Sequence, residues 1–289
     1  MAGLHERKFD RMRLKGVRGS RNIEDRRRSG AGGKASIGGV GLLIVLAIGY
    51  FAGIDVSPLL DGQMGGQSTA PRELSAEEEK AAEFAAQVLA TTETVWTDVF
   101  AEQLDAEYVP PVLVLYSGVT QSPCGGASGA TGPFYCPAEE KAYLDTDFFA
   151  TLARQLGAKG DFAAAYVIAH EVAHHVQNEM GILPQVNELR QQVNAAQANA
   201  LTVRLELQAD CLSGVWARNV DGMLEPGDLE EALNAARMIG DDHLQKRAGQ
   251  VPQPHTFTHG TSEQRSRWFA KGYKGGKINA CDTWNARQL

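Results

Sequence analysis

The motif His170-Glu171-Val172-Ala173-His174 follows directly on an almost wholly apolar stretch, residues 162–169, which contains no Gly or Pro. Such a stretch predicts a helix that is buried nearly all round. Residues four apart share a helix face, so His170 and His174 can bind one zinc ion at about 2.0–2.1 Å each. Glu171 is rotated by about 100° and can take a proton from a water bound to the metal. The pattern indicates hydrolysis by an activated water, with a peptide bond as the usual target.

A surface helix with two histidines and a solvated glutamate is the alternative interpretation, because a pattern with three fixed positions also arises by chance. The apolar context argues against it, since buried His and Glu side chains need partners, and zinc with its water would supply them. Asp161 is expected to cap this helix, which is expected to end near Gly181, with Pro184 beyond it.

A third metal ligand is predicted in a second apolar stretch, which contains Glu206 and Asp210, with 31 residues between His174 and Glu206. These two carboxylates are four residues apart and share a helix face. Glu206 can bind the metal, and Asp210 can accept the free ring N–H of a ligating histidine. A pair of ordinary exposed carboxylates is the alternative, which the apolar neighbours Leu205 and Leu207 disfavour.

HExxH followed by ExxxD is the pattern of gluzincin metallopeptidases. More specifically, the chain resembles the family of putative neutral zinc metallopeptidases, which are bacterial membrane-anchored proteins. The matching stretches are residues 13–16, 22–27, 124–125, 132–137, 143–145, 170–177, 206–211 and 258–265. The resemblance covers nearly the whole chain and implies a zinc-dependent, peptidase-like domain.

The charges divide the chain sharply. Residues 1–34 contain 11 Lys/Arg and 4 Asp/Glu, whereas the remainder contains 17 Lys/Arg and 31 Asp/Glu. The acidic main part argues against nucleic acid as its target. Residues 35–54 carry no charge and are long enough to span a bilayer, which predicts a transmembrane anchor in contact with membrane lipid. A cleaved signal peptide is the competing interpretation.

The basic residues before this segment place the N-terminus in the cytoplasm. The expected location is therefore the bacterial inner (cytoplasmic) membrane, with one span and a periplasmic or extracellular main domain. The predicted organisation is a basic cytoplasmic segment (1–34), an anchor (35–54), a flexible stalk (55–74) and a zinc metallopeptidase-like domain (75–289). The fold class is α+β and mostly helical: a zincin-like domain with a small strand region, preceded by one transmembrane helix.

All four cysteines, Cys124, Cys136, Cys211 and Cys281, follow the apolar segment. An even number in an exported domain predicts two disulfides, with three possible connectivities. Cys124 with Cys136 is favoured, because the glycine-rich segment between them must turn. Cys211 would then pair with Cys281 and attach the C-terminal tail to the helix that bears Glu206. A zinc thiolate is the alternative for Cys211.

Local patterns predict the remaining elements. A helix is expected from a capping box at Ser75 to about Leu104, and strands are expected at 112–116, 134–135 and 142–144. Further helices are expected at 148–156, 226–237 and 262–271.

Peptide hydrolysis also benefits from a donor to the developing oxyanion. His259 is the candidate, with Tyr116 and Tyr143 behind it, and a loop histidine bonded to the backbone is the alternative. His175 is expected beside a ligand or on the surface rather than on the metal. The strand 112–116 is a candidate for holding an extended substrate by edge pairing.

The predicted function is a membrane-anchored zinc metalloendopeptidase acting on a peptide or protein substrate. His170, His174 and Glu206 would hold one zinc ion, and Glu171 would act as general base. A catalytically silent zinc-binding envelope scaffold that binds a partner is the alternative. A soluble protease secreted after signal cleavage is a third hypothesis.

Overall fold

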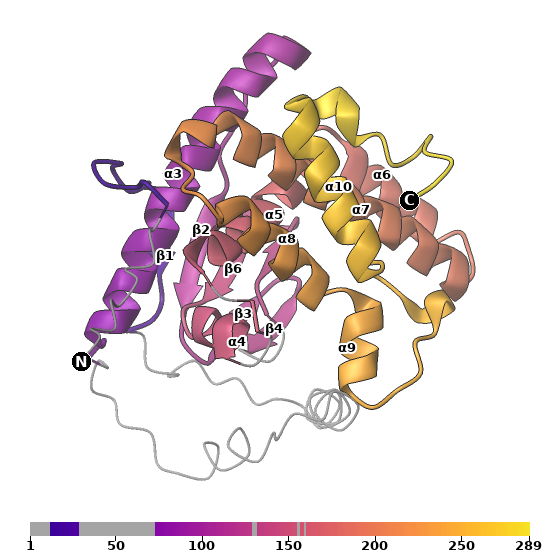
Figure 1. Cartoon of the computed structure of the whole chain (residues 1–289), viewed down its shortest axis with the longest axis horizontal. Helices are drawn as coiled ribbons and strands as arrows, with labels where there is room; N and C mark the ends of the chain where they lie inside the picture. The colour runs from indigo at the N-terminus through magenta and orange to yellow at the C-terminus, as the bar shows by residue number, and fades with distance from the viewer. Residues whose placement is uncertain (1–11, 29–72, 129–131, 155–156, 159) are drawn as a thin grey trace, which may run out of the picture.

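The computed structural model describes residues 12–28, 73–128, 132–154, 157–158 and 160–289. Helix α3 (Ala76–Leu104) runs along one side of the molecule (Figure 1), and α7 (Ala195–Asn219) and α10 (Ser262–Gly275) lie on the other. The sheet and α5 (Asp161–Glu179) lie between them. The other helical elements are α4 (Phe148–Arg154), α6 (Ile182–Arg190), α8 (Asp228–Met238), α9 (Asp241–Arg247), η1 (Asp221–Met223), η2 (Pro254–Thr256) and η3 (Ile278–Cys281).

The strands form one sheet of four strands and a separate hairpin. The sheet has the order β1-β2-β6-β5, in which β1 (Ile23–Asp25), β2 (Val112–Tyr116) and β6 (Lys141–Asp145) run parallel. β5 (Phe134–Cys136) pairs antiparallel with β6. The hairpin consists of β3 (Val119–Ser122) and β4 (Gly125–Ser128).

The two faces of β2 contribute to different apolar clusters. Leu113 and Leu115 belong to the main core, which also contains the apolar side chains of α5. Val114 and Tyr116 alternate with them and pack in a smaller cluster with Tyr143. Because successive strand residues point to opposite faces, Tyr116 and Tyr143 point away from α5.

Helix α3 begins where the sequence predicts. Ser75 accepts a hydrogen bond from the Glu78 N–H, and the Glu78 side chain accepts one from the Ser75 N–H, which completes the capping box. The predicted end at Leu104 is also confirmed, with Asp105 in the left-handed region at φ 50°.

Helix α5 differs in detail from the prediction. Gly160 is its N-cap and Asp161 is its first residue. A carboxylate at this position is stabilised by the positive end of the helix dipole. The helix ends at Glu179, and Gly181, at φ 72°, leads into α6. Pro184 lies beyond this end, as predicted, and falls in the first turn of α6. Proline is tolerated there because the N–H groups of a first turn have no partner within the helix.

Helices α7 and α10 pack with their backbones unusually close. A Cβ added at Gly272 would lie 1.8 Å from the Cys211 carbonyl oxygen, and one added at Gly214 would lie 2.1 Å from the Phe269 oxygen. Only glycine fits at these positions. This contact fixes α10 against the helix that carries Glu206 and Asp210.

The described part of the N-terminal segment packs on the main domain. β1 pairs with β2, and the Arg27 guanidinium donates a 2.7 Å hydrogen bond to the Glu78 carbonyl oxygen. Arg27 is buried and also forms an ion pair with Asp25. Residues 12–28 therefore pack against the domain that contains the HExxH motif.

Within the ranges that the structure describes, no helix combines the length and the apolar character that crossing a bilayer requires. Helix α5 is apolar and 19 residues long, but it contains the charged residues Asp161, Glu171 and Glu179. The predicted anchor, residues 35–54, and most of the predicted stalk lie outside the described residues. The predictions of a transmembrane helix and of a single-pass inner-membrane location are wrong on this finding, and the fold is mixed helical with small sheets.

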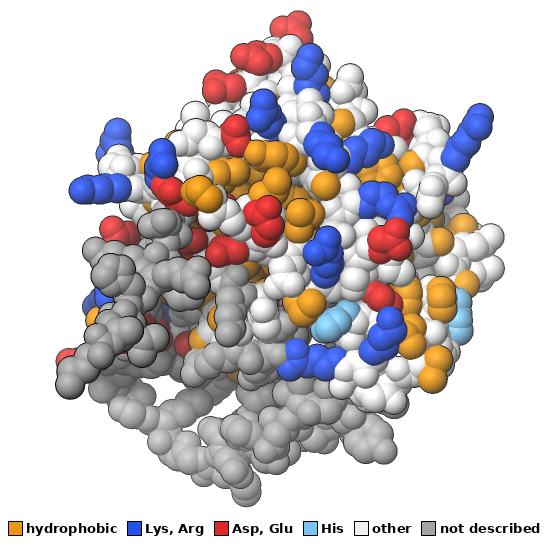
Figure 2. Space-filling model, in the orientation of Figure 1, with side chains coloured by type: hydrophobic (Ala, Val, Ile, Leu, Met, Phe, Trp, Pro, Cys, Tyr) orange, Lys and Arg blue, Asp and Glu red, His pale blue; other side chains and the backbone are white. Residues whose placement is uncertain are grey.

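Charges of both signs cover the surface. On the face shown in Figure 2, Lys and Arg side chains lie among Asp and Glu side chains. Several form exposed pairs, such as Arg218 with Asp221 at 3.1 Å. Because such pairs contribute only about 0–1 kcal/mol each, the core and the close helix contacts stabilise most of the fold.

Candidate metal centre

Helices α5 and α7 bring the three predicted ligands together. His170 Nε2 lies 3.1 Å from Glu206 Oε2, and His174 Nε2 lies 3.5 Å from Glu206 Oε1. One candidate ligand atom from each residue lies within 4.8 Å of the other two. His170 and His174 are buried, and the Glu206 side chain is 12% exposed. Sequence reasoning thus identified a set of residues that the fold does place side by side.

The donor set fits a zinc ion. Ligands at about 2.0–2.1 Å in a tetrahedral shell are separated by roughly 3.3–3.4 Å. The separations of 3.1 and 3.5 Å between imidazole nitrogens and carboxylate oxygens are close to this value. Two imidazoles and one carboxylate are the protein ligands of one class of catalytic zinc site, in which a fourth position takes water.

Asp210 lies behind His170, as predicted. Its Oδ1 is 2.9 Å from His170 Nδ1, so the other ring nitrogen, Nε2, faces Glu206. Burial acts to raise the pKa of Asp210, but the charge of Arg265 and the contact with His170 outweigh it and lower this pKa to about 2. Asp210 is therefore an anion at neutral pH.

Two further residues that complete this network were not predicted. Arg265 of α10 donates to both oxygens of Asp210 at 2.9 Å, and the Tyr166 hydroxyl donates to Oδ1 at 2.5 Å. Tyr166 lies four residues before His170 on the same face of α5, a spacing that could have identified it. No local pattern links Arg265 to Asp210, which is 55 residues away in the sequence.

The outer nitrogen of His174 has a different partner. Gln177, fully buried on α5, places Oε1 2.9 Å from His174 Nδ1. Sequence reasoning gave Gln177 no role, because an uncharged amide three residues after a ligand carries no signal of its own.

Without a metal, the centre is a cluster of coupled charges. Burial acts to lower the pKa of His170, but the hydrogen bond and charge of Asp210 and the hydrogen bond of Glu206 raise it to about 10. Burial likewise acts to raise the pKa of Glu206, and the nearby imidazolium charges hold it well below its usual range. These contacts favour a positive charge, a proton or a cation, between His170 and Glu206.

Glu171, the predicted general base, is 9% exposed. Burial raises its pKa, and the positive charges of His170 and His174 oppose that shift. A buried carboxylate with a raised pKa beside a cation site is suited to accept and return a proton near neutral pH.

His259 lies in the loop before α10, and its side chain is 48% exposed. Its Nδ1 is 3.4 Å from Asp241 Oδ1, and its backbone N–H donates to Asp241 Oδ2 at 2.6 Å. Burial acts to lower its pKa, but the charge of Glu206 and the bond to Asp241 raise it. A Cβ added at the adjacent Gly260 would lie 3.3 Å from a Leu207 side-chain atom, so this loop lies against the helix that carries Glu206. The role of His259 as an oxyanion donor stays a prediction.

The other groups proposed around the site lie elsewhere. Tyr116 and Tyr143 pack on the sheet face that points away from α5, so neither lies behind His259. Strand β2 pairs with β1 on one side and β6 on the other, so its edges cannot bind a substrate strand. The prediction of edge pairing by residues 112–116 is therefore wrong.

His175 is fully buried and belongs to the framework of α5. Its Nδ1 lies 2.9 Å from the Tyr135 hydroxyl, and its Nε2 lies 2.6 Å from the Val109 carbonyl oxygen. Burial lowers its pKa, and the hydrogen bond to Val109 opposes the shift. His175 connects α5 to β5. Both of its ring nitrogens have partners, as expected of a residue that is not a metal ligand.

Both predicted disulfides are present. Cys124 is bonded to Cys136 and Cys211 to Cys281, with Cα–Cα distances of 5.7 and 5.4 Å. The second bond excludes the alternative of Cys211 as a zinc thiolate, and it attaches η3 to α7.

A second group of carboxylates, Asp161, Asp228 and Glu231, also has oxygens within 4.8 Å of one another. These carboxylates have backbone partners: Asp228 accepts from the Glu225 N–H at 2.9 Å and Glu231 from the Phe162 N–H at 3.1 Å. The group contains no histidine or cysteine and is a capping cluster between α5 and α8.

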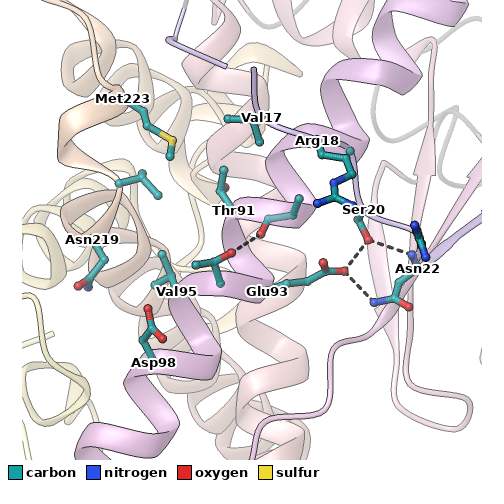
Figure 3. Close-up of a pocket in the computed structure, with 15 residues that line it drawn as sticks. Val17, Arg18, Ser20, Asn22, Thr91, Glu93, Val95, Asp98, Asn219 and Met223 are labelled. Carbon is teal, nitrogen blue, oxygen red and sulfur yellow. Dashed lines mark hydrogen bonds between the residues drawn. The ribbon is translucent and has the colours of Figure 1, made fainter. Parts of the chain in front are cut away.

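A surface pocket of about 600 Å³ lies between residues 17–22, α3 and the end of α7 (Figure 3). Within it, Glu93 accepts hydrogen bonds from Ser20 and Asn22. Neither the candidate ligands nor Glu171 line this pocket. It marks the seam where the N-terminal segment meets α3.

The HExxH helix, the nearby Glu206 and Asp210 behind His170 form the residue arrangement that is typical of HExxH zinc metallopeptidases. The chain belongs to the family described as putative neutral zinc metallopeptidase, whose model matches residues 12–284. Family membership implies zinc as the metal and peptides as the class of substrate.

Related proteins occur in Escherichia coli and in Mycobacterium tuberculosis. "Uncharacterized protein YpfJ" of Escherichia coli is 46% identical over 287 residues, covering 94% of this chain and 99% of the relative. "Uncharacterized protein Rv2575" of Mycobacterium tuberculosis is 44% identical over 195 residues, covering 63% of this chain and 65% of the relative. No solved structure shows significant similarity to this chain.

Proposed function

We propose that the chain is a zinc-dependent endopeptidase whose metal is held by His170, His174 and Glu206. The observation that carries this proposal is the approach of both imidazole Nε2 atoms to the Glu206 carboxylate, at 3.1 and 3.5 Å. Buried polar groups need partners, and a single cation would satisfy all three at once. Glu171 distinguishes a peptidase from a scaffold, because metal binding alone does not need it.

When bound, zinc lowers the pKa of a water ligand to about 7 and polarises the peptide carbonyl. Glu171 takes a proton from the attacking water and passes it to the leaving amine. Asp210 accepts from His170 Nδ1 and keeps Nε2 free for the metal. His259 donates a hydrogen bond to the carbonyl oxygen as negative charge develops on it.

The proposal is tested by comparing the full-length chain with its Glu171→Gln variant. Zinc content is measured after purification in metal-free buffer, and cleavage is followed by mass spectrometry on a denatured-proteome peptide library. We expect one zinc per chain in both proteins and a loss of cleavage of at least about 100-fold in Glu171→Gln.

If the zinc-loaded wild type cleaves no peptide, like the Glu171→Gln variant, the result contradicts the peptidase and favours a zinc-binding scaffold. A wild type that takes up no zinc contradicts both. His259→Phe provides the second comparison, since loss of an oxyanion donor should lower kcat by about 10²-fold with KM little changed.

A further inference from the structure

We propose that Gln177 and Gln208 form a buried amide relay that positions His174 for the metal and connects it to the disulfide-bonded C-terminal segment. The inference rests on the proposed zinc site and identifies positioning residues for it. The relay runs from His174 through Gln177 and Gln208 to the Cys281 carbonyl oxygen.

The contacts are continuous and buried. Gln177 Oε1 lies 2.9 Å from His174 Nδ1, and its Nε2 donates to the Leu205 carbonyl oxygen at 2.7 Å and to Gln208 Oε1 at 3.1 Å. Gln208 Nε2 donates to the Cys281 carbonyl oxygen at 3.1 Å. Gln177 is fully buried and Gln208 is 6% exposed.

The two backbone carbonyls fix the direction of every hydrogen bond in the relay. A carbonyl oxygen only accepts, so the Gln208 NH₂ must face Cys281 and its Oε1 must face Gln177. The Gln177 NH₂ then faces Leu205 and Gln208, which leaves Oε1 toward His174. Reversing either amide would set oxygen against oxygen at a buried position, which is costly.

It follows that His174 Nδ1 carries the hydrogen and that Nε2 presents its lone pair to the metal. Without this acceptor the ring could adopt either tautomer and could rotate. The relay therefore does for His174 what Asp210 does for His170, with a neutral amide in place of a charge.

The relay also joins the two ligand-bearing helices. The Leu205 carbonyl is the peptide neighbour of Glu206, so Gln177 binds α7 at the ligand while it orients His174. At the far end, Cys281 is fixed to α7 through Cys211. A shift of the C-terminal segment would therefore change the orientation of the proposed metal ligand His174.

The test separates two functions of Gln177: its Oε1 accepts from His174, and its NH₂ group donates to Leu205 and Gln208. Gln177→Leu removes both functions at nearly the same volume. Gln177→Glu keeps the acceptor toward His174 but loses the two donors toward Leu205 and Gln208. Val176→Ala, at a fully buried apolar neighbour outside the relay, is the stability control. Each full-length variant is measured for zinc affinity by chelator competition, for its Co²⁺ absorption spectrum and for thermal unfolding without metal.

We expect Gln177→Leu to bind zinc about 10–100-fold more weakly and Gln208→Leu several-fold more weakly. We expect Gln177→Glu to keep its zinc affinity and Co²⁺ spectrum close to wild type although it unfolds at a lower temperature. Val176→Ala should lose stability and keep its zinc affinity.

Wild-type zinc affinity in Gln177→Leu overturns the relay. Affinities that simply follow the unfolding temperature in all four variants overturn it as well, because a purely structural role predicts that result. These outcomes leave the proposed zinc site intact, whereas a wild type that binds no zinc overturns the site and the relay together.

Discussion

Arg265 donates hydrogen bonds to both carboxylate oxygens of Asp210, at 2.9 Å each, in a contact where neither side chain is more than 3% exposed. The pair connects α10 to α7 directly behind the candidate metal ligand His170. It fixes the orientation of the Asp210 carboxylate, so that Oδ1 remains toward His170 Nδ1.

Replacing Arg265 by Met should destabilise the chain by about 3–5 kcal/mol, because it leaves the buried charge of Asp210 without its main partner. Zinc affinity should fall as well, since the carboxylate is no longer held toward His170. Urea unfolding measures the first effect and chelator competition the second. Arg267→Met, at an exposed pair two residues further on, is the matched control and should cost no more than about 1 kcal/mol. Equal losses in the two variants would contradict the role given to Arg265.

Zinc binding should release protons. The contacts that raise the pKa of His170 to about 10 keep it protonated at neutral pH in the metal-free chain, and a metal must displace that proton. The apparent zinc affinity should therefore rise by up to about tenfold per pH unit between roughly pH 6 and 8. Calorimetry in buffers of different ionisation enthalpy measures the number of protons. Asp210→Asn should lower that number, and binding without proton release would count against the predicted ligand.

The capping cluster of Asp161, Asp228 and Glu231 should make stability depend on pH. Burial, aided by the charge of Asp161, raises the pKa of Glu231 to about 7 from an ordinary 4.5, although the bond from the Phe162 N–H opposes the shift. The folded state thus holds this proton more tightly than the unfolded chain. Its stabilising contribution is complete below about pH 4.5 and is lost as the pH rises through about 7.

Glu231→Gln should therefore stabilise the chain by roughly 1–2 kcal/mol near pH 8 and change it little near pH 4.5. The amide oxygen can still accept from the Phe162 N–H. Urea unfolding at the two pH values measures the difference, with Glu230→Gln at an exposed neighbour as control. A Glu231→Gln variant that is less stable at both pH values would refute this account of the cluster.

The two disulfides should contribute unequally. They close segments with sequence separations of 12 and 70, for which chain entropy gives about 3 and about 4 kcal/mol. Replacing Cys211 and Cys281 by Ala should lower the unfolding temperature more than replacing Cys124 and Cys136. It should also weaken zinc binding through the amide relay, whereas loss of the other disulfide should not. The opposite order of metal affinities would show that the C-terminal segment does not bear on the site.

Much of this arrangement was readable in the sequence because its signals are local. The capping box at Ser75 and Glu78 set the start of α3, and the four-residue spacings predicted which residues share a face on α5 and α7. The even number of cysteines predicted two disulfides, and the glycine-rich turn between Cys124 and Cys136 favoured the pairing that is present. Each of these inferences needs only short-range geometry.

The remainder depends on contacts that no local pattern encodes. Arg265 meets Asp210 across 55 residues, and Gln177 meets Leu205 across 28. β1 has three residues, too few for an alternating pattern, so its basic surroundings suggested a segment beside a membrane instead of a strand of the sheet. No local pattern shows which sheet face meets α5, so the sequence could not reveal that Tyr116 and Tyr143 lie on the opposite face.

The central claim is that one metal ion joins α5 and α7 through His170, His174 and Glu206. X-ray absorption at the zinc edge, on the full-length protein loaded with one equivalent of zinc, tests it most directly when wild type is compared with Glu206→Gln and His174→Ala. The account predicts two imidazole nitrogens and at least one carboxylate oxygen at about 2.0–2.2 Å, with one imidazole lost in His174→Ala. A spectrum dominated by water ligands, or one that neither substitution changes, would contradict it.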